Sequence, residues 1–144
     1  MSILQKFRMD GKKAIVTGGA RGIGRATALA FAEAGADVTV LDIRDTSETE
    51  AMIRDLGVKA YGIQCDLTKE DQVNAAFAQA AEKMGGIDIA HVNAGIAMCE
   101  KAEDMSFQQW RTVMAIDPEL GFQFPSLSQR EKSQKMENVL PKVV

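Results

Sequence analysis

Two kinds of hydrophobic pattern alternate along the chain, one typical of buried strands and the other of amphipathic helices. Short apolar or mixed runs at residues 14–16, 38–41, 59–65 and 87–92 have the length of strands. The longer segments between them repeat apolar residues every three or four positions and end at glycines. This order predicts βαβ units with right-handed crossovers, which favours an α/β fold with one parallel sheet.

The helix after the first strand is expected to bury a face of small and apolar side chains. The residues of that face are Ile23, Ala26, Ala30, Phe31 and Ala34. The small side chains would let this helix approach the sheet closely. The next helix is expected to begin at a cap formed by Thr46 or Ser47 and to stop at Gly57.

The two later helices carry start signals of the capping-box type. Thr68 with Asp71 is expected to begin the third helix, which has the clearest apolar stripe of the chain. Ser106 with Gln109 is expected to begin the fourth. That helix should end near Asp117, because the proline that follows disfavours helical geometry in the residue before it.

All prolines of the chain follow the fourth helix and mark a change of character. Pro118, Pro125 and Pro141 lie among Ser, Gln, Lys and Glu residues. We therefore expect residues 1–117 to form the α/β domain and residues 118–144 to form an irregular or disordered tail. The sheet is expected to be incomplete on its C-terminal side.

A glycine-rich turn follows the first strand. Residues Thr17 to Gly24 read Thr-Gly-Gly-Ala-Arg-Gly-Ile-Gly, and the glycines let backbone N–H groups approach a phosphate at the helix N-terminus. No Gly-Lys-Ser/Thr follows, which argues against a P-loop NTPase. Asp42 ends the second strand 18 positions after Gly24, close to the ~20 expected of a ribose-binding acid. Together these features favour a dinucleotide over a plain strand-to-helix turn.

Two further motifs at strand ends complete a resemblance to the classical short-chain dehydrogenase/reductase family. Asp66-Leu67 follows the third strand and Asn93-Ala94-Gly95 the fourth, so that the resemblance covers about residues 9–117. It implies a Rossmann-type parallel sheet in the order 3-2-1-4 and an NAD(P)-dependent oxidoreductase that acts on an alcohol, polyol or ketone. The cofactor-binding residues that it implies are Thr17, Gly18, Arg21, Gly22, Ile23, Gly24, Asp42, Asp66, Leu67, Asn93, Ala94 and Gly95.

The charges around the expected ribose site favour NAD over NADP. Asp42 would repel a 2′-phosphate, while it would accept hydrogen bonds from the free diol of NAD. Arg21 and Arg44 could instead bind that phosphate. We predict NAD as the cofactor and keep NADP as the alternative.

The catalytic groups that the resemblance implies are not matched in this sequence. In the family a tyrosine of a Tyr-x-x-x-Lys motif acts with a serine and a helical asparagine. Here the single tyrosine, Tyr61, is followed four positions later by Cys65, and Asp117 stands where the asparagine is expected. His91 lies in the fourth strand and is interpreted as a packed side chain. We therefore predict no catalytic residue, and a cofactor-binding portion that is inactive alone.

Two other classes of function remain open. One is a non-catalytic dinucleotide-binding or interaction fragment. The other is an S-adenosylmethionine-dependent methyltransferase, which would also place glycines after the first strand and an acid after the second. The Asn-Ala-Gly segment, Asn93 to Gly95, favours the dinucleotide over S-adenosylmethionine.

The composition and charge of the chain argue against several classes of partner. A formal net charge of −3 and a sequence pI near 5.2 argue against a nucleic-acid partner, and no apolar run reaches the ~18 residues of a membrane span. The two cysteines fit neither a disulfide framework nor a zinc site, so we expect no metal. We expect a cytoplasmic location, a dinucleotide as the partner, and loss of the oligomer interface typical of the family.

Overall fold

The structure is a computed structural model that describes residues 2–101 and 103–116, and the predicted tail 118–144 lies outside them. Strands and helices alternate along the chain as the hydrophobic pattern predicts. The elements are η1 (Leu4–Phe7), β1 (Lys13–Thr17), α1 (Gly22–Glu33), β2 (Asp37–Asp42), α2 (Ser47–Asp55), β3 (Ala60–Gln64), α3 (Glu70–Met84), β4 (Ile89–His91) and α4 (Phe107–Ile116).

The four strands form one parallel sheet in the order β3-β2-β1-β4, which confirms the predicted order. Ile15 in β1 is paired with Thr39 in β2 on one side and with Ala90 in β4 on the other. Thr39 is paired in turn with Tyr61 in β3. Strands β3 and β4 are shorter than the stretches 59–65 and 87–92 from which they were predicted.

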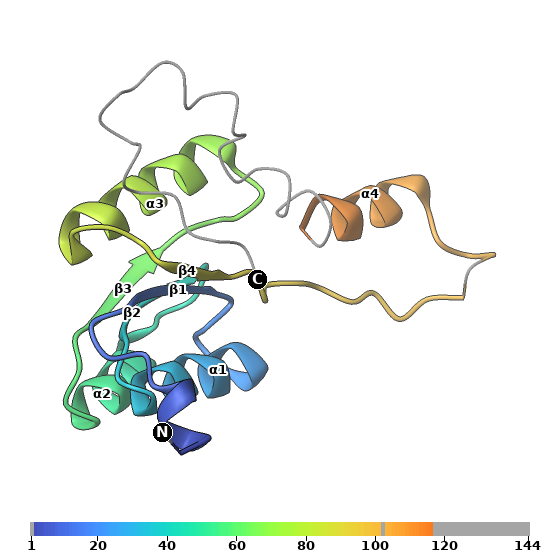
Figure 1. The fold of residues 1–144 in the computed structure, drawn as a ribbon. Helices are drawn as coiled ribbons and strands as arrows, with labels where there is room; N and C mark the ends of the chain where they lie inside the picture. Colours follow the sequence, from blue (N-terminus) through green and yellow to red (C-terminus); the bar gives the residue numbers. More distant parts are fainter. Residues whose placement is uncertain (1, 102, 117–144) are drawn as a thin grey trace.

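The sheet separates two hydrophobic cores, because successive side chains of a strand point to opposite faces. Ile15 and Leu41 belong to the core shared with α3, whereas Val16 and Val40 belong to the core shared with α1 and α2. All four are fully buried. Figure 1 shows the resulting three layers, with α1 and α2 on one side of the sheet and α3 on the other.

The predicted buried face of α1 is wrong at Ile23, Ala26 and Ala30, whereas Phe31 does pack against the core that contains Ala28 and Ala32. Ile23 is 77% exposed, and Ala26 and Ala30 are also exposed. The buried residues are Gly24, Ala28 and Ala32, which recur every four positions. Their side chains are among the smallest in the helix, so this face allows the closest approach to the sheet; choosing the more hydrophobic positions pointed to the other side of the helix.

The start of α4 is predicted correctly and that of α3 is not. Gln109 N donates to Ser106 Oγ at 3.2 Å, and Ser106 N donates to Gln109 Oε1 at 2.7 Å, which is a reciprocal capping box. The N-cap of α3 is Lys69, with no side-chain cap. Thr68 instead donates its hydroxyl to Asp66. The competing carboxylate two residues upstream explains the error.

Helix α2 begins where the sequence predicts, but the hydrogen bonds at its start are not those of the expected cap. Thr46 is the N-cap residue, yet it makes no side-chain hydrogen bond to the helix backbone. Its hydroxyl donates to Glu50 Oε1 at 2.9 Å, and Ser47 N donates to Asp45 Oδ1 at 3.2 Å. Side chains on both sides of the first turn therefore order this helix start.

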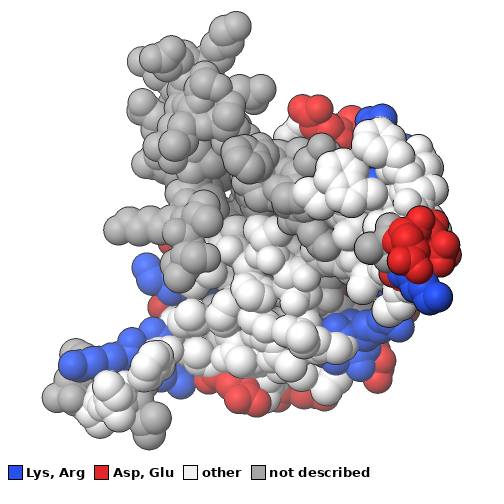
Figure 2. Space-filling view, turned by 90° about the vertical axis from the view of Figure 1, so that its right-hand side faces the viewer, with Lys and Arg blue, Asp and Glu red and all other residues white. Residues whose placement is uncertain are grey.

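α4 projects to one side of the sheet after an extended segment (Figure 1). Seen from that side, the described surface is mostly uncharged, and side chains of both signs lie toward its margins (Figure 2). Within the described ranges, no helix has both the length and the apolar content needed to cross a bilayer.

Candidate functional site

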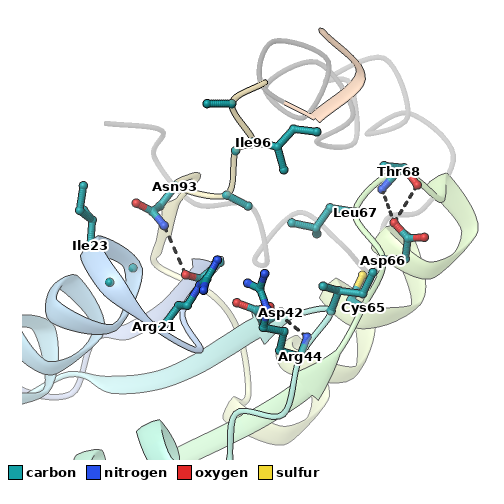
Figure 3. A pocket seen from close by; sticks show the side chains of 17 residues that line it. Arg21, Ile23, Asp42, Arg44, Cys65, Asp66, Leu67, Thr68, Asn93 and Ile96 are labelled. Atoms are coloured by element: carbon teal, nitrogen blue, oxygen red, sulfur yellow. Dashed lines mark hydrogen bonds between the residues drawn. The ribbon is translucent and has the colours of Figure 1, made fainter. Parts of the chain in front are cut away.

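A pocket of about 530 Å³ lies where the carboxyl ends of all four strands meet. This volume is within the range of about 300–1,000 Å³ typical of small-molecule and cofactor sites. Every predicted cofactor residue except Thr17 lines it, and Figure 3 shows their side chains. Arg44, which the sequence offers as an alternative phosphate ligand, lines it too, and the structure adds five residues that directly follow or flank the predicted ones: Ile43, Cys65, Thr68, Ile96 and Ala97. Their position just after strand ends is the signal that could have found them.

The glycine turn leaves backbone open to the pocket. Gly18 and Gly22 have φ of +69° and +59°, in the left-handed region that favours glycine. A Cβ at Gly22 would meet no protein atom within 4 Å, so the space beside this pocket-lining backbone is free. Arg21, the N-cap of α1, makes no side-chain bond to the first turn, whose N–H groups lack intrahelical partners. This geometry suits a phosphate group.

The turn is also packed tightly against itself and against the segment that follows β4. A Cβ at Gly24 would lie 2.1 Å from Gly18 O and 2.6 Å from Asn93 Nδ2. A Cβ at Gly18 would lie 2.9 Å from Ala94 Cα. These two glycines are required because backbone approaches backbone, whereas Gly22 is required for its positive φ.

Thr17 connects β1 to the end of β4. Its side chain is buried, and its Oγ1 accepts hydrogen bonds from Asn93 N at 3.0 Å and Ala94 N at 3.1 Å. Asn93 Nδ2 donates in return to Thr17 O at 3.1 Å. Thr17 therefore fixes the floor of the pocket without lining it, which explains why it is the one predicted residue outside the lining.

Asp42 is held at the edge of the pocket by two backbone amides. Its Oδ2 accepts a hydrogen bond from Ala20 N at 3.0 Å, and its Oδ1 accepts one from Arg44 N at 3.0 Å. Only 5% of the residue is exposed. A carboxylate has about four lone-pair sites, so both oxygens can accept further hydrogen bonds from a ligand.

Asp66 and Thr68 form a second polar edge, beyond Asp42 in Figure 3. Asp66 Oδ1 accepts hydrogen bonds from Thr68 Oγ1 at 2.7 Å and from Thr68 N at 3.0 Å. The hydroxyl bond from Thr68 is the main cause that lowers the pKa of Asp66. Leu67, between them, is buried and contributes to the core next to α3. This side of the pocket therefore offers an ionised acceptor beside an apolar wall.

Cys65 lines the pocket, but only 1% of it is exposed, and burial, helped by the charges of Asp66 and Asp71, raises the pKa of its thiol. We expect iodoacetamide at pH 7.5 to label Cys99, which is exposed, and to spare Cys65. Mass spectrometry of the digested protein measures both sites. The same reaction in urea is the control and should label both cysteines; native labelling of Cys65 at the rate of Cys99 would contradict the buried position.

The two other candidates for proton transfer lie away from the pocket. Tyr61 packs against the core next to α3, and Lys83 Nζ lies 5.9 Å from the centroid of its ring. His91 stands edge-on to Phe31, with ring centroids 6.1 Å apart. Neither lines the pocket. Among the described residues, no group of three or more His, Cys, Asp or Glu side chains is arranged to hold a metal ion.

The fold and the pocket define a doubly wound α/β nucleotide-binding domain. After β1 the chain builds one half of the sheet through β2 and β3, and it then returns to place β4 on the other side of β1. The crevice outside the carboxyl ends of the strands at such a reversal is where doubly wound folds bind nucleotides.

Comparison with known proteins supports this assignment to a nucleotide-binding α/β fold. The family model for the short chain dehydrogenases matches residues 12–119, and the chain belongs to this family. It is 38% identical over 120 residues to the D-threitol dehydrogenase of Mycolicibacterium smegmatis. The matched region covers 81% of this chain and 46% of that dehydrogenase. The chain spans about half of the length of the curated relatives that it matches.

Solved structures show the same fold. A short-chain type dehydrogenase/reductase from Mycobacterium marinum superposes with a TM-score of 0.82 at 38% identity, over 85% of this chain and 51% of that one. The carveol dehydrogenase from Mycobacterium avium, solved in complex with NAD, gives a TM-score of 0.76 at 26% identity, over 81% of this chain and 47% of that one.

Proposed function

We propose that residues 1–117 are the NAD-binding portion of a short-chain oxidoreductase that acts on an alcohol, a polyol or a ketone, and that the chain alone carries out no hydride transfer. The observation that carries this proposal is the pocket at the carboxyl ends of the four strands, with an open glycine turn on one side and Asp42 on the other. The NAD complex of a structural neighbour and the polyol named for a relative support it. The bound dinucleotide would supply the hydride donor or acceptor.

Different residues of the pocket would bind different parts of the dinucleotide. The turn from Gly18 to Gly24 would receive the pyrophosphate, because open N–H groups and the helix N-terminus favour negative charge there. Asp42 would accept hydrogen bonds from the ribose diol, and Asp66 with Leu67 would border the adenine. Asn93 to Gly95 would form the floor beside the second ribose.

The preference for NAD over NADP follows from charge. A 2′-phosphate would have to enter beside the Asp42 carboxylate, which is nearly buried and acts where repulsion is poorly screened. Arg21 and Arg44 line the same pocket and would attract that phosphate. Arg44 contacts Asp42 through its backbone N–H, and we propose that the carboxylate of Asp42, and not the side chain of Arg44, meets the diol.

Calorimetric titration of the chain tests the ligand class. We expect NAD and ADP-ribose to bind and S-adenosylmethionine not to bind. The reverse preference would refute the proposal and favour the methyltransferase interpretation. Absence of binding by all three ligands would also refute it.

Substituting Asp42→Asn tests the preference within that class. We expect the ratio of NAD to NADP affinity to fall by about tenfold, since the amide removes the negative charge that repels the 2′-phosphate. Asp45→Asn is the matched control, because Asp45 lies three residues further along the chain, bonds to Ser47 and does not line the pocket. An equal change of the ratio in both variants would contradict the role of Asp42.

A further inference from the structure

Behind the glycine turn, on the side of α2, lies a hydrogen-bonded cluster that does not line the pocket. Arg25, in the first turns of α1, donates from Nε to Thr49 Oγ1 at 3.0 Å and from Nη2 to Ala20 O. The same Nη2 donates to Glu48 Oε2 at 2.7 Å. Thr49 is fully buried, and its hydroxyl donates to Gly19 O at 3.0 Å.

The direction of each hydrogen bond in this cluster is fixed. The guanidinium group of Arg25 can only donate, so Thr49 Oγ1 must accept from it. The one hydroxyl proton of Thr49 is then free to point at Gly19 O. Two successive carbonyls of the turn, those of Gly19 and Ala20, thus receive donors from one arginine and one buried threonine.

These bonds set the orientation of two peptide planes. In a trans peptide the C=O and the N–H point in opposite directions. The plane between Gly19 and Ala20 is held at both ends, since its C=O accepts from Thr49 and its N–H donates to Asp42 Oδ2 at 3.0 Å. The plane between Ala20 and Arg21 is held by Arg25 at its C=O, which fixes the direction of the Arg21 N–H.

We propose that Arg25 and Thr49 are positioning residues for dinucleotide binding: they hold the turn between its two left-handed glycines in the shape that receives the pyrophosphate, without touching the ligand. This inference rests on the proposed function and names the residues that prepare its site. A loop that is already ordered in its bound shape loses less conformational entropy when the ligand binds.

The exposed end of the cluster contributes little to this role. The side chain of Glu48 is 73% exposed, and surface ion pairs of this kind have small effects. The side chain of Arg25 is only 25% exposed, and its other two partners, Thr49 Oγ1 and Ala20 O, belong to buried residues. The effect on binding therefore depends on Arg25 and Thr49.

The experiment measures affinities of the full chain and its Arg25→Met and Thr49→Val variants for NAD, ADP and adenosine, by calorimetry and ligand-observed NMR. We expect both variants to weaken NAD and ADP by about tenfold, the effect of a lost hydrogen bond to a charged group. Adenosine lacks the pyrophosphate, and its affinity should change less than threefold. Arg25→Lys keeps one charged donor and should recover part of the loss.

Arg54→Met is the matched control. Arg54 also bonds a glutamate and a backbone carbonyl, Glu50 Oε2 at 2.7 Å and Ala60 O at 3.0 Å, but it lies at the other end of α2 and away from the turn. It should leave all three affinities within twofold. Equal losses in Arg25→Met and Arg54→Met, or an equal loss for adenosine and NAD, would overturn the proposal.

Amide hydrogen exchange separates this proposal from the proposed function. Residues 18–24 should exchange faster in Arg25→Met and Thr49→Val than in the parent chain or in Arg54→Met. If the parent chain binds no NAD, the proposed function fails, and faster exchange in the two variants would still show that Arg25 and Thr49 order the turn. If the parent chain binds NAD, and both exchange and affinity are unchanged in the two variants, the positioning role of Arg25 and Thr49 is refuted and the proposed function is not.

Discussion

Substituting Gly24→Ala is expected to abolish detectable NAD binding and to lower the free energy of unfolding by about 3 kcal/mol, the upper range for an overpacked site. The added Cβ would lie 2.1 Å from Gly18 O, which belongs to the backbone of the turn. It would also lie 2.6 Å from Asn93 Nδ2, which bonds to Thr17 O. The turn has to move away from α1 to relieve these close contacts, and that movement changes the shape of the pocket.

Urea unfolding and calorimetry of the variant measure the two effects. Gly57→Ala is the control, because a Cβ at Gly57 meets nothing within 4 Å, so that only the strain of its positive φ, +87°, remains. It should cost about 1 kcal/mol through backbone strain and leave NAD affinity unchanged. A Gly24→Ala chain that binds NAD like the parent would show that the close approach in the turn is not needed.

The parent chain is expected to give no NAD-dependent oxidation of sugar alcohols, secondary alcohols or steroids above background, even with saturating NAD. A positioned acid or base commonly contributes ~10²–10⁴-fold to rate, and an oriented substrate contributes more. Tyr61 and His91 pack elsewhere, on the α3 core and on Phe31. The acidic side chains of the pocket, Asp42 and Asp66, are engaged in holding the turn and Thr68.

The rate of oxidation is measured by NADH absorbance while the purified chain is incubated with NAD and each class of alcohol. The Gly24→Ala variant serves as the blank, since it should lack the cofactor site but share any contaminating enzyme. Turnover that survives repeated purification and disappears in Gly24→Ala would mean that residues outside the described ranges supply the missing acid or base.

The parallel α/β sheet could be predicted from the sequence because apolar runs, glycines and helical stripes repeat in βαβ units, whereas the strand order was implied by the family resemblance. The face of α1 could not, because close packing against the sheet selected Gly24, Ala28 and Ala32 for their size, whereas hydrophobicity singles out Ile23. The start of α3 was missed for a local reason, since Asp66 takes the hydroxyl of Thr68 that a capping box would use.

The pocket was easier to predict than the contacts that support it. Residues that follow parallel strands meet at one edge of the sheet, so motifs at four strand ends had to come together. The roles of Arg25 and Thr49 depend on the distance between α1 and α2, which no local pattern specifies. The contacts of Thr17 could not be predicted either, because its place in the motif did not reveal that its side chain faces Asn93 and not the pocket.

The two backbone bonds of Asp42 have a consequence for how coenzyme preference can evolve in this chain. Its two oxygens satisfy Ala20 N and Arg44 N, whereas an amide or a hydroxyl at this position offers a single accepting oxygen. If Asp42 sets the coenzyme preference as proposed, a lineage that exchanges the acid to admit a 2′-phosphate also loses one of the two oxygens that now accept these N–H groups. A second substitution that gives Ala20 N or Arg44 N a new partner would lower the cost of the switch, so the order of the two mutations matters.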